Sequence, residues 1–325
     1  MGVTAESTMQ HTPIKVAIVG AGYMASEHAR ALVAWPGVRI VGVCGRQRAR
    51  ADGLASAYGA EVFDSIEQMH SATRADVVVV AVNELSMASV FKQVFAHPWS
   101  VLLEKPVGVN LAATRHTVEM ARGHRAWVAL NRRAYGATRA ALEQLDANAG
   151  PRLISVFDQQ NMEDAASGGQ PLEVVRNYMY ANSIHLIDYF RTFGRGRVRE
   201  VRVAQPWRPE TPGHVVATLH FDSGDVGVYQ AVWDGPGPWM VTVTDQRVRV
   251  ELRPLERVAV QRRGERHLTE LPAAKRDSEF KPGLYCLAGW LLEELAGAAT
   301  PLPTLREALE STELVARIYG LDGSR

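Results

Sequence analysis

The chain has 325 residues, of which 46% are hydrophobic and 22% are charged, and its formal net charge at pH 7 is +1. This composition is ordinary for a soluble globular protein, and the length predicts two domains. The small net charge argues against a nucleic-acid surface, which needs a concentrated basic face. The two cysteines, Cys44 and Cys286, lie in segments assigned to different domains, which excludes a disulfide framework.

The sequence lacks the features of a membrane or secreted protein. No apolar run approaches the roughly 18 residues needed to span a bilayer. The segment from Met1 to Thr12 lacks the apolar core of a signal peptide. We therefore expect a cytoplasmic protein in which residues 1–13 form a flexible tail.

A glycine fingerprint follows the first apolar segment of the chain. Val16–Val19 is expected to be a buried strand, G-x-G-x-x-A begins at Gly20, and a helix is expected from Ser26 to about Trp35. Gly20 permits the tight turn, and Gly22 has no Cβ that would keep a pyrophosphate off the backbone. The N-terminus of the helix offers unpaired N–H groups to phosphate. This stretch therefore predicts a dinucleotide site.

Further apolar segments follow in the order of a β-α-β-α-β chain. Val38–Cys44 is the second expected strand, and Ala75–Val82, after another helical segment, is the third. This order predicts a parallel, doubly wound α/β sheet of the Rossmann type.

The end of the second expected strand bears on the choice of cofactor. A carboxylate about 20 residues beyond the fingerprint would hold the adenine ribose of NAD, but the sequence there is Cys44-Gly45-Arg46. Arg46 offers a planar, permanently charged fork to a 2′-phosphate. We therefore favour NADP over NAD, although Arg46 could simply begin a basic helix.

An acid, a base and a proline end another expected strand. Ser100–Leu103 leads directly into Glu104, Lys105 and Pro106. Ligands of doubly wound sheets bind at the carboxyl ends of the strands, which places Lys105 at the expected cofactor cleft. The alternative is that Glu104 and Lys105 form a surface ion pair, which would contribute little to folding stability.

From Arg152 onward, apolar and polar residues alternate with the period of two that is typical of half-buried strands. The expected elements are strands over Leu153–Phe157, Val198–Val203, Val215–Phe221, Val226–Trp233, Met240–Thr244 and Val248–Leu252, and helices over Leu172–Phe193, Gly283–Leu295 and Leu305–Tyr319. We expect a large, mostly antiparallel open sheet. The sequence thus predicts a dinucleotide-binding domain over residues 1–130 and an α+β domain for substrate binding and oligomerisation over 131–325.

Several motifs together resemble one known family. They are G-A-G-Y-M-A at 20–25, E-K-P at 104–106, N-R-R at 131–133, S-I-H-L-I-D at 183–188 and L-P-T-L-R-E-A at 302–308. From about Ile14 to Tyr319 the chain is similar to the Gfo/Idh/MocA oxidoreductases, the relatives of glucose-fructose oxidoreductase and inositol dehydrogenase. The resemblance implies a Rossmann domain followed by an α+β domain whose open sheet forms a homodimer or homotetramer.

The resemblance also implies an activity. It is hydride transfer between NAD(P) and a hydroxyl or keto carbon of a sugar, sugar nucleotide or cyclitol. In the family the lysine of E-K-P lies near the nicotinamide and the substrate oxygen, and the histidine of the helix acts as acid or base; these roles fall on Lys105 and His185. Such a pair suits the reaction, since an ammonium stabilises a developing alkoxide and a group with a near-neutral pKa delivers the proton.

The expected site combines these motifs. The residues expected at the cofactor are Gly20, Gly22, Tyr23, Met24, Gly45, Arg46, Asn83, Glu104 and Lys105. Those expected at the substrate are Arg133, Tyr135, Arg176, Asn182 and His185. No metal site is expected.

Two positions depart from the family pattern. Many relatives carry an aspartate one helical turn before the histidine, where this chain has Ala181, and many carry a histidine beyond the third strand, where it has Leu85-Ser86-Met87. We expect Asn182 or Tyr178 to orient His185 instead. The missing aspartate leaves a second interpretation open, a non-catalytic regulatory protein that binds the cofactor. Retention of both expected catalytic residues favours the enzyme.

Overall fold

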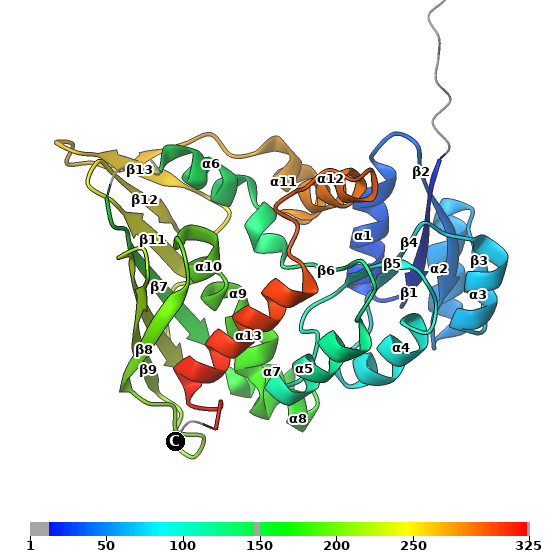
Figure 1. Cartoon of the computed structure of the whole chain (residues 1–325), viewed down its shortest axis with the longest axis horizontal. Helices are drawn as coiled ribbons and strands as arrows, with labels where there is room; N and C mark the ends of the chain where they lie inside the picture. The colour runs from blue at the N-terminus through cyan, green and yellow to red at the C-terminus, as the bar shows by residue number, and fades with distance from the viewer. Residues whose placement is uncertain (1–12, 146–149, 324–325) are drawn as a thin grey trace, which may run out of the picture.

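The computed structural model describes residues 13–145 and 150–323 and contains two sheets (Figure 1). The first sheet is built by the N-terminal part of the chain and the second by residues 153–270. The N-terminal strands lie at the right of the view and the second sheet stands at the left, with helices between them. The expected pairing of a Rossmann-type sheet with a larger, mostly antiparallel sheet is therefore confirmed.

The first sheet has six parallel strands in the order β3-β2-β1-β4-β5-β6. The strands are β1 Ile14–Val19, β2 Val38–Cys44, β3 Glu61–Phe63, β4 Val77–Val80, β5 Ser100–Leu103 and β6 Ala126–Val128. The four valines of β4 are all buried, because helices cover both faces of the sheet. The strand Glu61–Phe63 was not expected, since three residues are too few to show a periodic pattern. The strand expected over Ala75–Val82, counted there as the third, is therefore β4.

Helices alternate with these strands. They are α1 Tyr23–Val33, α2 Arg48–Tyr58, α3 Ile66–Thr73, the short 3-10 turn η1 Glu84–Ser86, α4 Met87–Val94 and α5 Leu111–Met120. Because β1 pairs with both β2 and β4, the chain leaves β1 in one direction along the sheet and returns on its other side. The crevice at such a reversal, beyond the carboxyl ends of the strands, is where doubly wound sheets bind ligands.

The second sheet has eight strands in the order β14-β13-β12-β11-β7-β10-β9-β8. They are β7 Leu153–Gln160, β8 Val198–Gln205, β9 His214–Phe221, β10 Val226–Trp233, β11 Met240–Thr244, β12 Val248–Leu252, β13 Ala259–Arg262 and β14 Thr269–Glu270. Within the described part of this sheet, β7 and β10 pair in parallel and the other pairs are antiparallel. The last two strands were not expected. Alternate residues of the central strands are buried, and the drawn helices lie on one side of the sheet (Figure 1).

The remaining helices lie between or beside the sheets. They are the 3-10 turn η2 Asn131–Ala134, α6 Gly136–Gln144, α7 Met162–Ser167, α8 Leu172–Arg176, the π-helix η3 Met179–Ser183, α9 Ile184–Ile187, α10 Tyr189–Phe193, α11 Lys275–Glu279, α12 Leu284–Leu295 and α13 Leu305–Tyr319. None of the helices in the described ranges is long and apolar enough to cross a membrane.

Two C-terminal helices hold the sheets together. Helix α12 packs on α1, where Trp35 stacks on Tyr285 with ring centroids 4.7 Å apart and donates to its carbonyl oxygen. Helix α13 begins with a capping box between Thr304 and Glu307, and its buried residues join the cores of both sheets. The end of the chain thus returns to the first sheet and fixes the cleft between the two halves.

Candidate active site

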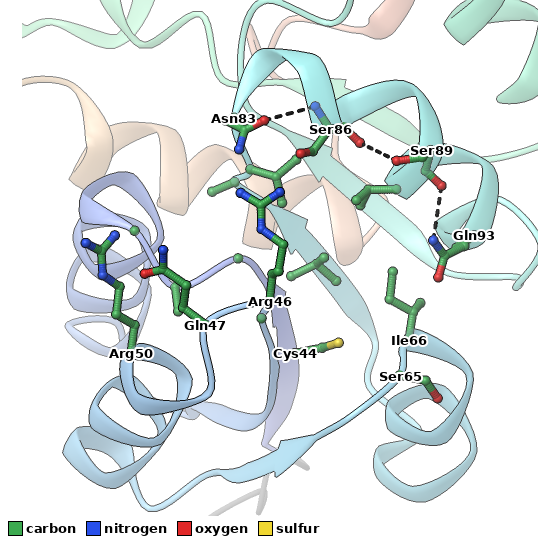
Figure 2. Close-up of a pocket in the computed structure, with 18 of the residues that line it drawn as sticks. Cys44, Arg46, Gln47, Arg50, Ser65, Ile66, Asn83, Ser86, Ser89 and Gln93 are labelled. Carbon is green, nitrogen blue, oxygen red and sulfur yellow. Dashed lines mark hydrogen bonds between the residues drawn. The ribbon is translucent and has the colours of Figure 1, made fainter. Parts of the chain in front are cut away.

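The carboxyl ends of the parallel strands border a cavity of about 510 Å³. Its lining includes Gly20 and Gly22 of the fingerprint, Gly45 and Arg46 after β2, and Asn83 after β4 (Figure 2). These residues meet because β1 lies between β2 and β4 in the sheet. The cofactor residues expected from three separate motifs therefore face one space.

The first turn of α1 is open to an anion. Gly22 is the N-cap of this helix, no side chain caps it, and no acid lies in its first turn. A Cβ on Gly22 would meet no atom within 4 Å, whereas a Cβ on Gly20, at φ 110°, would lie 2.0 Å from the Ala81 carbonyl oxygen. Gly20 is thus required by the fold, while Gly22 leaves room for a pyrophosphate over the helix N-terminus.

Basic side chains stand at the rim of this cavity. Arg46 projects from the end of β2 toward the Asn83 turn, and Arg50, which was not expected, also lines the cavity (Figure 2). Arg48 lies outside the lining and pairs with Asp52 at 2.9 Å and with Asp64 at 2.8 Å. Among the described residues no carboxylate pairs with Arg46. Its guanidinium therefore remains available to a ligand.

A second cavity, of about 480 Å³, continues from the first toward the eight-stranded sheet. Both cavities are lined by Gly22, Ala81, Val82 and Asn83. The second is also lined by the expected residues Tyr23, Met24, Glu104, Lys105, Tyr135, Asn182 and His185. The structure thus brings Lys105 and His185 together in one cavity beside the glycine turn.

Glu104 and Lys105 do not form a surface ion pair, so that alternative is wrong. Glu104 is buried, and its carboxylate contacts His28 Nε2 at 2.7 Å and accepts a hydrogen bond from the Lys105 backbone N–H at 3.0 Å. The Lys105 ammonium points elsewhere and donates to the Ala181 carbonyl oxygen at 3.1 Å. The acid therefore positions the backbone of Lys105 and leaves its ammonium directed across the cavity.

The surroundings of Lys105 disfavour its charged form. Burial lowers the pKa of the Lys105 ammonium, and the neighbouring cations Arg132 and Lys281 act in the same direction. Glu104 and Glu84 oppose this shift but do not cancel it. Strongly perturbed groups in clefts are frequent at functional sites.

The Ala181 position lies in a π-helix. The π-turn Met179–Ser183 directs the Ala181 carbonyl toward Lys105, so a main-chain oxygen contacts the lysine at the position where the resemblance implied an aspartate in relatives. His185, in α9, is 6% exposed, and its Nδ1 has no hydrogen-bond partner among the described residues. The expected orientation of His185 by Asn182 is not observed, because the Asn182 amide donates to Gln160 Oε1 at 2.8 Å.

A buried polar network supports the π-helix η3. Gln160, which accepts from Asn182, donates to the carboxylate of Asp158 at 2.6 Å, and the Tyr229 hydroxyl donates to the same carboxylate at 2.7 Å. Burial raises the pKa of Asp158, while these donors oppose the shift. The network connects strand β7 to the lining of the second cavity through Asn182.

Two arginines expected at the substrate do not line the cavity. Arg133 forms a fork to Asp188, at 2.7 and 2.8 Å, and also contacts Glu307 at 3.1 Å. Although burial disfavours the carboxylate, Arg133 holds the pKa of Asp188 below its usual value. Removing one partner of such a buried pair costs about 3–5 kcal/mol, which indicates a structural role. Arg176 is exposed on α8, outside the cavity lining.

Sequence reasoning missed two basic residues of the second cavity, Arg132 and Lys281. Arg132 stands in the N-R-R motif, so a signal was present, but nothing in the sequence distinguished it from Arg133. Lys281 lies over the Tyr23 ring, with its Nζ 5.2 Å from the ring centroid. Its place at the cavity depends on the packing of α12 against α1, which no local pattern predicts.

The comparisons with known proteins concern the family and the fold. The sequence model of the GFO_IDH_MocA family, described as an oxidoreductase family with an NAD-binding Rossmann fold, matches residues 14–131. The N-terminal part of the chain, residues 14–131, thus matches the Rossmann domain of this family. A stretch of 107 residues is 35% identical to an inositol 2-dehydrogenase of Rubrobacter xylanophilus; it covers 33% of this chain and 31% of that relative's length.

Solved structures extend the likeness from these residues to the whole fold. A dehydrogenase from Chromobacterium violaceum is 20% identical with a TM-score of 0.80, and the match covers 96% of each chain. An oxidoreductase from Agrobacterium radiobacter, in complex with NAD+, L-tartaric acid and magnesium, is 16% identical with a TM-score of 0.72 over 96% of this chain and 97% of the other. At these identities the likeness shows the shared fold.

The two glycines of the turn should respond differently to the same substitution. Gly20→Ala should lower the unfolding free energy by at least about 1 to 3 kcal/mol through backbone strain, with a further loss from its contact with Ala81. Gly22→Ala should leave thermal unfolding unchanged but weaken cofactor binding, because the new Cβ enters the space over the helix N-terminus. Thermal melts and cofactor titrations would check both. Wild-type cofactor affinity in Gly22→Ala would contradict this interpretation of the cavity.

Proposed function

We propose that this protein is an NAD(P)-dependent oxidoreductase that transfers a hydride between the nicotinamide and a hydroxyl or keto carbon of a sugar, sugar nucleotide or cyclitol. The observation that carries the proposal is the meeting of Lys105 and His185 in a cavity continuous with the glycine turn. The inositol 2-dehydrogenase relative and the neighbour bound to NAD+ and tartaric acid support a polyol-like substrate.

The cofactor fits the residues that are present. The α1 N-terminus and the space over Gly22 would hold its pyrophosphate, and the nicotinamide would extend into the second cavity. When bound, the cofactor supplies or accepts the hydride. The Lys105 ammonium then stabilises the negative charge that develops on the substrate oxygen during ketone reduction. His185 gives a proton to that oxygen, and the same steps run in reverse during alcohol oxidation.

Replacement of Lys105 by methionine tests its catalytic role. Lys105→Met should reduce kcat by on the order of a hundredfold or more, since the ammonium acts chiefly on transition-state charge. A matched control is Lys92→Met, which removes an exposed lysine of α4. A change of less than about threefold with chemistry rate-limiting would remove Lys105 from the mechanism.

The same variant, Lys105→Met, should alter the pH dependence of folding stability. Because the folded state lowers the pKa of Lys105, the folded protein binds this proton more weakly than the unfolded chain does. This term therefore destabilises the fold below the folded pKa and vanishes as pH rises through the unfolded pKa. Lys105→Met should raise the thermal midpoint at neutral pH. Wild-type turnover should fall as pH rises through the folded pKa, which lies below the ordinary lysine value.

Such an assay also separates the enzyme from the regulatory alternative. Cofactor binding without turnover on a panel of ketosugars and polyols would favour a non-catalytic regulator. The cavity retains both the ammonium and the imidazole, an arrangement that a cofactor sensor does not need. We therefore favour an enzyme over a non-catalytic regulator.

For the cofactor, we propose a preference for NADPH over NADH. Arg46 has no acid partner among the described residues and Arg50 also lines the cavity, so these side chains offer positive charge to a 2′-phosphate. Arg46→Ala should weaken NADPH binding by about 1 to 3 kcal/mol, the scale of a hydrogen bond to a charged group, and leave NADH nearly unaffected. Arg48→Ala, which removes a neighbouring arginine outside the lining, is the control. Equal losses for the two cofactors would contradict the preference.

We also propose a homodimer or homotetramer formed through the open face of the eight-stranded sheet. The half-exposed residues on that face include the apolar side chains of Phe157, Val216, Val228 and Val232. Light scattering should give two or four times the chain mass of 35.7 kDa. Val216→Glu with Val228→Glu should then yield a folded particle of lower mass. A wild-type mass of one chain would refute the proposal.

A further inference from the structure

The second cavity has more positive than negative charge available to a ligand. Lys105, Arg132 and Lys281 line it, against the acids Glu84 and Glu104. Glu104 is already engaged by His28 and by a backbone N–H. The cofactor pyrophosphate proposed over Gly22 would face Lys281, but the nicotinamide ring carries no negative charge that could meet Arg132. The excess therefore points to an anionic group on the other ligand.

Arg132 is the cation whose bonding is most incomplete. Its guanidinium lies over the Trp239 ring, 4.5 Å from the centroid. Its Nε and Nη1 are buried, and neither has a hydrogen-bond partner among the described residues. Arg133, its neighbour in sequence, binds two carboxylates. Buried donors without acceptors cost free energy, which a ligand that supplies the acceptors recovers on binding.

Trp239 positions the Arg132 guanidinium so that it can bind a planar anion. The indole N–H donates to the Gln159 carbonyl oxygen at 2.6 Å, which fixes the ring. The contact with the ring restricts the position of the guanidinium, whose N–H donors point outward within its own plane. A carboxylate or a phosphate accepts two parallel hydrogen bonds from such an edge.

The position of Arg132 assigns it to the substrate rather than to the cofactor phosphates. The pyrophosphate place lies over Gly22, and Lys281 sits beside it on the Tyr23 ring. Arg132 comes from η2, and its stacking partner Trp239 precedes β11 of the second sheet. Arg132 lines the second cavity and is absent from the lining of the first.

We propose that the substrate carries an acidic oxygen group, a carboxylate or a phosphate ester, and that Arg132 binds this group while Lys105 and His185 act on a hydroxyl or keto carbon of the same molecule. The inference rests on the proposed oxidoreductase function and narrows its substrate class to acidic sugars or polyols. Arg132 is then the residue that discriminates acids from neutral analogues.

Binding to the full-length protein saturated with reduced cofactor tests this without requiring turnover. Two matched sets would be titrated by calorimetry: glucuronate, glucose 6-phosphate and glucose as ring compounds, and gluconate, sorbitol 6-phosphate and sorbitol as open chains. At least one acid should bind tenfold or more tightly than its neutral counterpart. The carboxylate and phosphate arms show which of the two anions the cavity accepts.

Variants then assign the discrimination to one residue. Arg132→Gln should abolish the preference for the acid and leave binding of the neutral analogue and of the cofactor within about twofold. Arg132→Lys should restore only part of the preference, because an ammonium lacks the planar fork. Arg139→Gln is the matched control, since Arg139 also lies over a tryptophan ring, that of Trp290 at 5.6 Å, and is outside the cavity lining.

Three outcomes would overturn the inference: no acid in either set outcompetes its neutral analogue, Arg132→Gln weakens acid and neutral ligands equally, or it weakens the cofactor instead. The result is separable from the proposed function. Acid binding through Arg132 without turnover would sustain the acidic ligand and refute the enzyme. Turnover of neutral polyols without a preference for acids would sustain the enzyme and refute the acidic substrate.

Discussion

The ammonium of Lys105 lies between the two halves of the protein and forms no ion pair with a carboxylate among the described residues. A lysine at the end of a buried strand would ordinarily pair with the adjacent acid, but Glu104 is engaged by His28 on α1. The lysine is left with one main-chain acceptor, the Ala181 carbonyl, from the second half of the chain. A charge in this state destabilises the fold and is therefore available to stabilise negative charge on a ligand.

Much of the remaining architecture keeps that arrangement in place. The π-turn presents the Ala181 carbonyl, and the Asp158–Gln160–Asn182 network holds the π-turn against β7. The two hydrogen bonds between Arg133 and Asp188 join η2 to the junction between helices α9 and α10. Helices α12 and α13 pack on α1 and α5 of the first half, and α13 also packs on α9 and β8 of the second. Cavity shape thus depends on contacts between segments far apart in sequence.

Ala181, one helical turn before His185, contributes a main-chain oxygen and no carboxylate to the site. A carboxylate beside His185 would raise the pKa of the imidazole and orient its ring. Here the alanine provides no such group, and the imidazole Nδ1 is buried without a described partner. The positive character of the cavity is correspondingly greater. A cofactor and an acidic substrate would together supply the negative charge that the protein does not.

The sequence alone determined the elements whose signals are local. A four-valine strand, a glycine turn with the required spacing and long alternating strands follow from backbone sterics and burial, and these segments formed as expected. The family motifs also placed Lys105 and His185 in one cavity. Short strands such as Glu61–Phe63 carry too few residues to show a period, so they were missed.

Only the tertiary structure decided which of two adjacent arginines is structural and which faces the cavity. Arg132 and Arg133 have the same chemistry and are adjacent in sequence. Their roles differ because Asp188 and Glu307, from helices far along the chain, converge on one of them, while Trp239 meets the other. Likewise, the partner of Glu104 comes from α1 and not from the lysine that follows it. Local spacing determines secondary structure, but the pairing of charges is set by which distant segments the fold brings together.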